Sequence, residues 1–246
     1  MRQKLAGIAI TDHCDVEYAH QMDVKTPILQ SVQTAVRLNE AYGAQLQVFR
    51  GVELGEALFY PNVATEVLQQ SMYDVVIGSV HAARWKTTVP YSHLDFTTMD
   101  PLQVTDYLHT YFNDVLETAE MVDFDVLAHL TCPLRYIVLK YGCAADLTPH
   151  AAQVEQILKT IIQRDIALEV NTSATCATEV RTLPDMEIVR QYYALGGRKI
   201  TLASDAHAAA RVGCGFENAA TQLRRIGFNT AFYYRNRTAV PYALTP

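Results

Sequence analysis

The chain has 246 residues, of which 50% are hydrophobic and 19% are charged. This composition supplies the apolar surface of one large core and excludes a wholly disordered protein. Acidic residues outnumber basic ones by 26 to 20, the net charge is −6, and no run of Lys or Arg forms a basic patch. Long nucleic acid is therefore not an expected partner.

No apolar run approaches the roughly 18 residues that a membrane helix needs. Residues 1–5 also lack the apolar stretch of a signal peptide. We therefore expect a cytoplasmic protein that does not associate with membranes. The five cysteines are dispersed and never form a Cys-x-x-Cys pair, which argues against a thiolate zinc site or a redox pair.

Short apolar runs rich in β-branched residues alternate with segments of helical periodicity, as is typical of βα units on a parallel sheet. The predicted strands are residues 7–11, 46–54, 75–80, 126–130, 166–171, 199–204 and 230–234. The predicted helices are residues 28–42, 64–71, 101–121, 149–164, 184–195 and 216–226. Residues 82–100 are expected to form a long loop near a site.

Seven strands with interleaved helices favour a distorted, TIM-like β/α barrel, and an open doubly wound sheet is the alternative. A single domain spanning residues 1–246 is expected, because such barrels commonly use roughly 200 to 250 residues. The class is α/β in either case.

Most of the predicted strands end in a side chain that binds metal or phosphate. The residues are His13, Glu53, His81, His129, Asp205 and His207. Because β/α barrels place their sites at the carboxyl ends of the strands, we expect these side chains to converge. A lone histidine is more often a hydrogen-bonded structural residue, but six such positions together indicate one site.

Imidazole and carboxylate ligands suit Zn, Mn or Fe better than Ca. Asp205 and His207 are two residues apart on an extended segment, so their side chains point to the same side and suit one ion or two adjacent ions. Glu53 is placed to bridge two ions. Two such ions would clamp a phosphoryl group during in-line displacement.

These segments resemble the PHP superfamily of metal-dependent phosphoesterases, in particular its histidinol-phosphate phosphatases. The resemblance spans nearly the whole chain and rests on the motifs IAITDH, GVE, IGSVH, DVLAH, LEVNTS and LASDAH, which begin at residues 8, 51, 77, 125, 168 and 202. It implies a distorted seven-stranded barrel with two or three divalent ions. The implied reaction converts L-histidinol phosphate and water to L-histidinol and phosphate, in histidine biosynthesis.

The same resemblance implies roles for individual residues. It makes His13, Glu53, His81, His129, Asp205 and His207 metal ligands, with Glu53 as the bridge. Asp205 and His207 are also candidates for assisting proton transfer to the leaving oxygen.

A phosphate needs a cation besides the metals, and arginine has the best-shaped donors for it. Arg135, six residues after His129, is the first candidate, and a surface arginine is the alternative. Asn171 is placed by strand geometry to hold substrate or orient a ligand, or else to cap the strand. Histidinol phosphatases often carry an arginine shortly after the Asn-Thr-Ser segment; here residues 174–176 are Ala-Thr-Cys, and Arg181 is the candidate replacement.

The family usually opens with a first strand that carries Asp-x-His-x-His, and no His-x-His occurs in this chain. We therefore expect a domain that lacks the first βα unit of the family and binds fewer ions. Two alternatives to the histidinol-phosphate phosphatase stay open. One is a PHP phosphoesterase acting on nucleotides or oligonucleotide ends, and the other is a degenerate, non-catalytic metal-binding protein.

Overall fold

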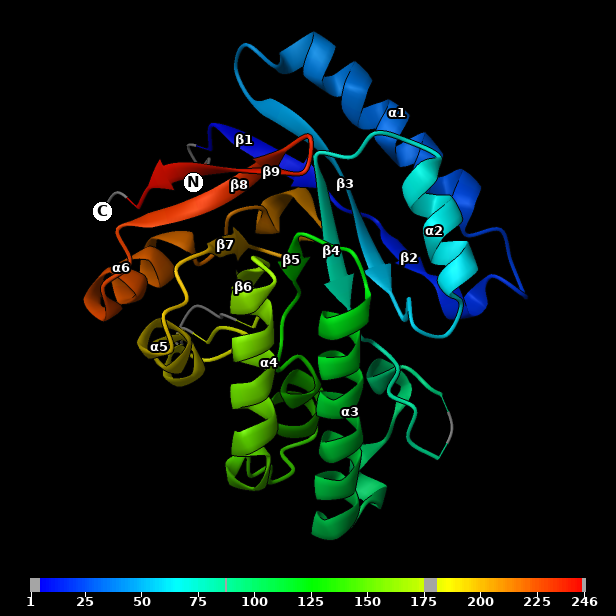
Figure 1. The fold of residues 1–246 in the computed structure, drawn as a ribbon, viewed down its shortest axis with the longest axis vertical. Helices are drawn as coiled ribbons and strands as arrows, with labels where there is room; N and C mark the ends of the chain where they lie inside the picture. Colours follow the sequence, from blue (N-terminus) through cyan, green and yellow to red (C-terminus); the bar gives the residue numbers. More distant parts are fainter. Residues whose placement is uncertain (1–4, 87, 175–180, 245–246) are drawn as a thin grey trace.

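A curled parallel sheet forms the centre of the protein (Figure 1). The computed structural model describes residues 5–86, 88–174 and 181–244. The strands of this sheet are β1 (Gly7–Ile10), β2 (His13–Asp15), β3 (Gln47–Gly55), β4 (Val75–Ser79), β5 (Val126–Leu127), β6 (Ala167–Asn171) and β7 (Ile200–Ala203). Their order is β1-β3-β4-β5-β6-β7. β2 follows β1 along the same edge of β3 and pairs with the carboxyl-terminal part of β3. Among the described residues β1 and β7 do not pair, so the sheet is a half-barrel, as the distorted-barrel prediction allows.

Helices occupy the connections between the strands. They are α1 (Lys25–Tyr42), α2 (Pro61–Gln69), α3 (Pro101–Met121), α4 (Ala151–Gln163), α5 (Met186–Ala194) and α6 (Phe216–Ile226). Short 3-10 turns lie at Val16–Tyr18, Tyr91–His93, Phe96–Thr98, Thr148–His150 and Ala209–Arg211, and a π-type turn at Arg135–Lys140. In the described part of the chain, no helix has both the length and the apolarity needed to cross a bilayer.

The ends of the helices follow from local chemistry. At the start of α3, the Asp100 side chain accepts from the Gln103 backbone N–H, and the Gln103 side chain accepts from Asp100 N–H. These two hydrogen bonds form a capping box. Pro101 at the first turn adds a preset φ angle that suits the helix. The predicted bounds 101–121 and 216–226 are confirmed, and the other helices shift by up to three residues.

Alternation along β3 separates the core from the site. Val52 and Leu54 are fully buried in the main hydrophobic cluster, and Glu53 between them points to the opposite face of the strand. The same alternation in β6 places Leu168 and Val170 in that cluster and Glu169 on the other face. The helices therefore cover an apolar outer surface of the sheet while carboxylates face the inside of the half-barrel.

The last predicted strand is present but does not join the parallel sheet, contrary to the prediction. Residues 230–234 lie in β8 (Thr230–Arg235), which pairs antiparallel with the unpredicted β9 (Thr238–Ala243) instead of joining the parallel sheet. Asn236 and Arg237 connect the two strands, and both have positive φ angles of 48° and 61°. This is the conformation of the tight hairpin turns that match strand twist.

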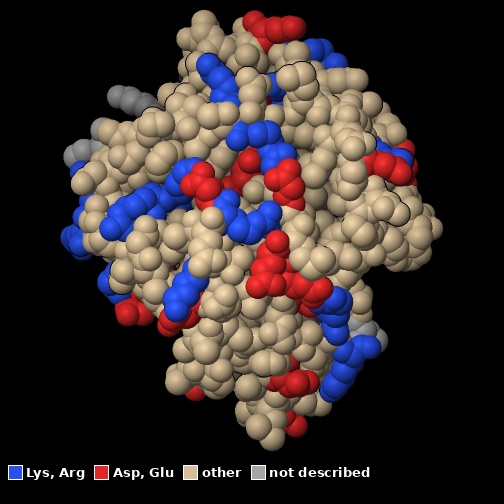
Figure 2. All heavy atoms as spheres, viewed as in Figure 1, with Lys and Arg blue, Asp and Glu red and all other residues tan. Residues whose placement is uncertain are grey.

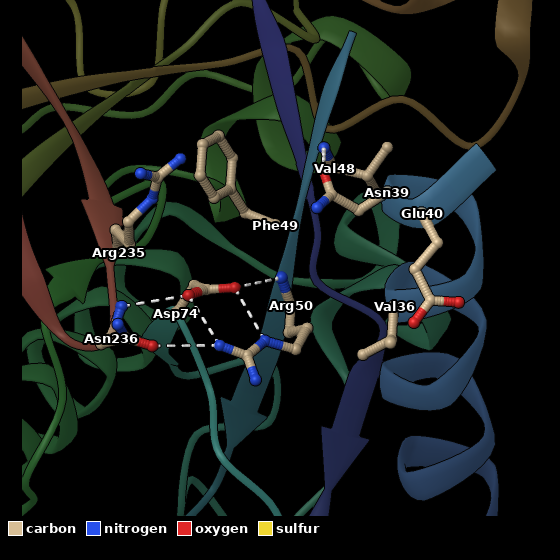
Figure 3. A pocket seen from close by; sticks show the side chains of 9 residues that line it. All are labelled: Val36, Asn39, Glu40, Val48, Phe49, Arg50, Asp74, Arg235 and Asn236. Atoms are coloured by element: carbon tan, nitrogen blue, oxygen red, sulfur yellow. Dashed lines mark hydrogen bonds and ion pairs between the residues drawn. The ribbon is translucent and has the colours of Figure 1, made fainter. Parts of the chain in front are cut away.

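The β8–β9 hairpin covers the amino-terminal ends of the parallel strands. Tyr234 packs with Val75, Val126 and Ala167 in a separate small cluster. Asp74 accepts four hydrogen bonds, from the Arg50 backbone N, Nε and Nη2 and from the Asn236 backbone N. Figure 3 shows this network beside a hollow of about 360 Å³ between α1, β3 and the hairpin turn.

We expect Asp74→Ala to lower the free energy of unfolding by roughly 2 to 4 kcal/mol. Asp74 is buried, and its removal takes away the carboxylate that accepts from the Arg50 guanidinium and from two backbone N–H groups. Urea unfolding at neutral pH measures the change. Asp123→Ala is the control, since its largely exposed carboxylate pairs only at the surface with Arg237. Equal small losses in both variants would show that the hairpin network does not stabilise the fold.

Candidate metal centre

Glu53 lies at the middle of a cluster of imidazoles at the carboxyl end of the sheet. Its side chain is 9% exposed, and its Oε1 lies 3.0 Å from His129 Nε2 and 3.1 Å from His81 Nε2. Its Oε2 lies 3.5 Å from His13 Nδ1, and β2 and β3 pair His13 directly with Glu53. The structure thus brings four of the six predicted ligands together.

The protonation of this cluster follows from its contacts. Burial alone would raise the pKa of Glu53, but hydrogen bonds with His129 and His81 hold it well below its usual value. Burial opposes the charge on His129, yet the nearby Cys132 and the hydrogen bond with Glu53 raise its pKa to about 9. Without a metal, the buried carboxylate is therefore compensated by protons on the imidazoles.

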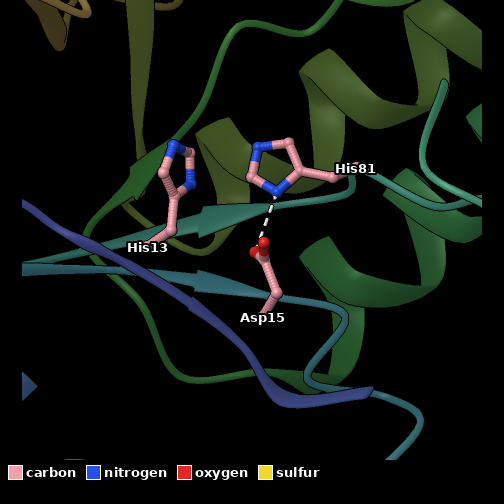
Figure 4. A group of neighbouring side chains, drawn as sticks. All are labelled: His13, Asp15 and His81. Carbon is pink, nitrogen blue, oxygen red and sulfur yellow. Dashed lines mark hydrogen bonds and ion pairs between the residues drawn. The ribbon is translucent and has the colours of Figure 1, made fainter. Parts of the chain in front are cut away.

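His81 is held from two sides. Its Nε2 faces Glu53, and its Nδ1 lies 3.0 Å from Asp15 Oδ1 (Figure 4). Its backbone N–H donates to Glu56 Oε1, which also accepts from Ala82 N at 2.8 Å. Asp15 was missed in the sequence, because its approach to His81 depends on the pairing of β2 with β3, which the residue pattern does not reveal.

Two further buried carboxyl groups support the cluster. Glu169 Oε2 accepts from the His129 backbone N at 2.7 Å and from Asn171 Nδ2 at 3.2 Å, and burial raises its pKa to about 7. Burial also raises the pKa of Glu56 well above its usual value. The alternation of Glu169 and Asn171 with the apolar residues of β6 is a sequence signal for an inward-facing polar pair.

Asp205 and His207 lie beside the cluster and not within it. Arg135 Nη2 donates to Asp205 Oδ2 at 3.0 Å and to Ser173 Oγ. The His207 ring is 5.8 Å from the His13 ring, and the His207 side chain is 71% exposed. Asp205 has a φ of 45°, a left-handed conformation that is uncommon outside glycine and is found at functional sites.

The two other predicted substrate-binding residues, Asn171 and Arg181, lie in different surroundings. Asn171 is fully buried, and its Oδ1 accepts from the Ser173 backbone N at 2.9 Å and from Ser173 Oγ. It therefore holds the loop that carries the Ser173 contact to Arg135. Arg181 is exposed and follows residues 175–180, which include Thr175 and Cys176 and lie outside the described residues.

The side chains present fit a divalent metal ion. Within the described residues, two groups have ligand atoms that all lie within 4.8 Å of one another: Glu53, His81 and His129, and His13, Asp15 and His81. Both combine imidazole nitrogen with carboxylate oxygen, the set that suits Zn, Mn or Fe. In addition, His129 Nδ1 is buried without a hydrogen-bond partner among the described residues, so the ring has an unused nitrogen.

We expect the metal-free protein to lose stability as the pH rises from about 6.5 to above 9. A histidine whose pKa is raised by folding stabilises the protein fully below its unfolded pKa, and this contribution disappears as the pH passes the folded value of about 9 for His129. Urea unfolding in excess chelator over this range tests the trend. His129→Gln should flatten it and the control His20→Gln, at an exposed residue, should not; rising stability would contradict this account.

Several known proteins are similar to this chain in sequence. A "Probable histidinol-phosphatase" of Clostridium acetobutylicum is 26% identical over 94% of this chain and 86% of its own length. One of Thermotoga maritima is 36% identical over a segment that covers 48% of each chain. A "Histidinol-phosphatase" of Lactococcus lactis is 24% identical over 92% of this chain and 81% of its own length.

A solved structure has the same fold. The crystal structure of histidinol phosphate phosphatase from Lactococcus lactis, complexed with Zn, L-histidinol and phosphate, superposes with a TM-score of 0.78 at 20% identity. The alignment covers 96% of this chain and 88% of that one. Residues 1–173 also match the family described as "PHP domain". The chain therefore belongs to the PHP domain family.

Proposed function

We propose that this chain is a metal-dependent phosphomonoester hydrolase that converts L-histidinol phosphate to L-histidinol and phosphate. The observation that carries the proposal is the buried Glu53 carboxylate facing His81 Nε2 and His129 Nε2 at the carboxyl end of a curled parallel sheet. The relatives named histidinol-phosphatase, and the Lactococcus lactis structure that holds Zn, L-histidinol and phosphate, support the substrate.

The metal ligands in this proposal are His13, Glu53, His81, His129, Asp205 and His207. Zn, Mn and Fe suit these donors, and the proposed site holds one to three ions. A divalent ion held by these residues would polarise a phosphoryl oxygen and offset the charge that develops on it. Glu53 supplies the fixed negative charge that favours a cation in this buried position.

Arg135 is assigned to the substrate, and His207 is assigned to proton transfer in addition to its ligand role. Arg135 reaches the edge of the site from the π-type turn Arg135–Lys140, where its Nη2 contacts Asp205 and Ser173. Its remaining guanidinium donors suit phosphate oxygens. His207 is exposed beside His13, and its ring nitrogen can give a proton to the leaving oxygen of histidinol. Asn171 takes a positioning role, because its contacts with Ser173 keep the Arg135 partner in place.

Charge at the surface disfavours the nucleic-acid alternative. On the face seen in Figure 2, Lys and Arg are interspersed with Asp and Glu, and no continuous basic band crosses that face. A phosphodiester chain needs such a band for affinity. A small phosphomonoester needs only the local cations of the site.

Glu53→Gln is expected to lower kcat/KM for L-histidinol phosphate at least 100-fold, because it keeps the size of the side chain and removes the charge shared by His81 and His129. Release of inorganic phosphate by Zn- or Mn-loaded protein measures the activity. Glu66→Gln, at an exposed residue paired with Lys25, should leave it unchanged.

Three outcomes would contradict parts of this assignment. A preference for phosphodiesters over L-histidinol phosphate would favour another PHP phosphoesterase. Tight metal binding with no hydrolysis of either class would favour a non-catalytic protein. Full activity of the Glu53→Gln variant would overturn the central role of Glu53.

Arg135→Lys is expected to raise KM for L-histidinol phosphate about 10-fold or more, because lysine keeps the charge but loses the forked donors that match phosphate. Steady-state kinetics separates KM from kcat. Arg190→Lys on α5, where the side chain is exposed and paired with Glu187, serves as the control. An unchanged KM in Arg135→Lys would place the phosphate elsewhere.

A further inference from the structure

The two ring nitrogens of His81 face two different carboxylates. Nε2 lies 3.1 Å from Glu53 Oε1, and Nδ1 lies 3.0 Å from Asp15 Oδ1. A neutral imidazole carries one N–H, so one nitrogen donates a hydrogen bond while the other is free to bind a metal. The surroundings of His81 therefore decide which nitrogen is the ligand.

The geometry favours Nε2 as the ligand. This nitrogen faces the carboxylate oxygen that His129 Nε2 also approaches, so these two imidazoles and this carboxylate could together hold a cation. Asp15 lies against the opposite nitrogen (Figure 4). We propose that Asp15 is a positioning residue: its carboxylate accepts the hydrogen of His81 Nδ1–H and so presents Nε2, unprotonated, to the metal held with Glu53 and His129.

The position of Asp15 is built into the sheet. Gly55 is the direct partner of Asp15 in the β2–β3 pairing, and a Cβ at Gly55 would lie 2.3 Å from Asp15 Oδ1 and 3.2 Å from His81 Nδ1. Its φ lies outside the left-handed region, so the backbone does not require glycine there. Glycine is needed because only a residue without a side chain leaves space for this hydrogen bond.

The other end of His81 is fixed as well. Its backbone N–H and that of Ala82 both donate to Oε1 of the buried Glu56, the residue after Gly55. The end of β3 thus acts on His81 in two ways. Glu56 fixes the His81 backbone, and Gly55 leaves room for the Asp15 carboxylate that orients the His81 ring. Partners of this kind commonly change metal affinity 10- to 100-fold when they are lost.

The first test measures zinc affinity of the full chain by competition with a chromophoric chelator, with zinc per chain counted by elemental analysis. Asp15→Asn should bind zinc 10- to 100-fold more weakly with the same number of ions, because the amide is neutral and is a weaker acceptor for Nδ1–H. Asp12→Asn is the control, since that exposed carboxylate contacts Ser31 and not the cluster. Unchanged affinity in Asp15→Asn would overturn the proposal.

Gly55→Ala tests the same contact from the other strand. Its Cβ displaces the Asp15 carboxylate, so it should weaken zinc binding to a similar extent. The double variant Asp15→Asn/Gly55→Ala should be no weaker than the worse single variant, because both changes remove one interaction. Additive losses would show that Gly55 acts independently of Asp15.

Two readouts separate a positioning role from others. Loss of one zinc ion per chain in Asp15→Asn would make Asp15 a ligand of the His13, Asp15 and His81 group and overturn the proposal. In zinc-loaded wild-type protein, nitrogen NMR should show His81 protonated at Nδ1 and not at Nε2, and the reverse tautomer would also overturn it. The NMR result stands even if a variant fails to fold.

This inference rests on the proposed function only in taking the cluster as a metal site. Zinc affinity is measured without substrate, so an inactive wild-type protein that binds zinc tightly would contradict the substrate while leaving the role of Asp15 testable. A wild-type protein that binds no zinc would contradict both the metal centre and the role of Asp15.

Discussion

A carboxylate withdrawn from water needs compensating positive charge, and Glu53 sets this requirement for the carboxyl end of the sheet. His81 and His129 contact one of its oxygens, and His13 approaches the other. Protons on the imidazoles meet the requirement in the absence of metal, and a divalent cation meets it with two charges at one point. The same geometry therefore explains both the perturbed pKa values and the preference of the site for a metal.

The two ends of the half-barrel use buried charge differently. At the amino-terminal end, Asp74 is paired with the permanently charged Arg50 and with backbone N–H groups, and the contacts close the β8–β9 hairpin onto the sheet. Arginine does not lose its proton at ordinary pH, so this end is a fixed structural pair. At the other end the partners of Glu53 are histidines, which exchange protons for metal. The fold thus separates a stabilising network from a reactive one.

Sequence patterns predicted most of this architecture for identifiable reasons. The helical periodicity predicted α3, and the rule that parallel strands converge at their carboxyl ends brought His13, Glu53, His81 and His129 into one set. The β8–β9 hairpin was missed because Asn-Arg is a weaker turn signal than Asn-Gly and Pro241 interrupts the pattern of β9. Neither the Asn-Arg turn nor the strand β9 can be assigned from the sequence pattern without the tertiary contacts of Tyr234.

Asp15 shows why a site is harder to predict than its ligands. A ligand is recognised by its residue type at a strand end, whereas Asp15 acquires its role from a neighbour on another strand, where Gly55 leaves it room beside His81. Replacing Gly55 by alanine would leave every ligand in the sequence unchanged and still alter the surroundings of the ring. Retained ligand residues therefore describe which metals the site suits, while the glycine and carboxylate behind them determine how well the ligands are oriented.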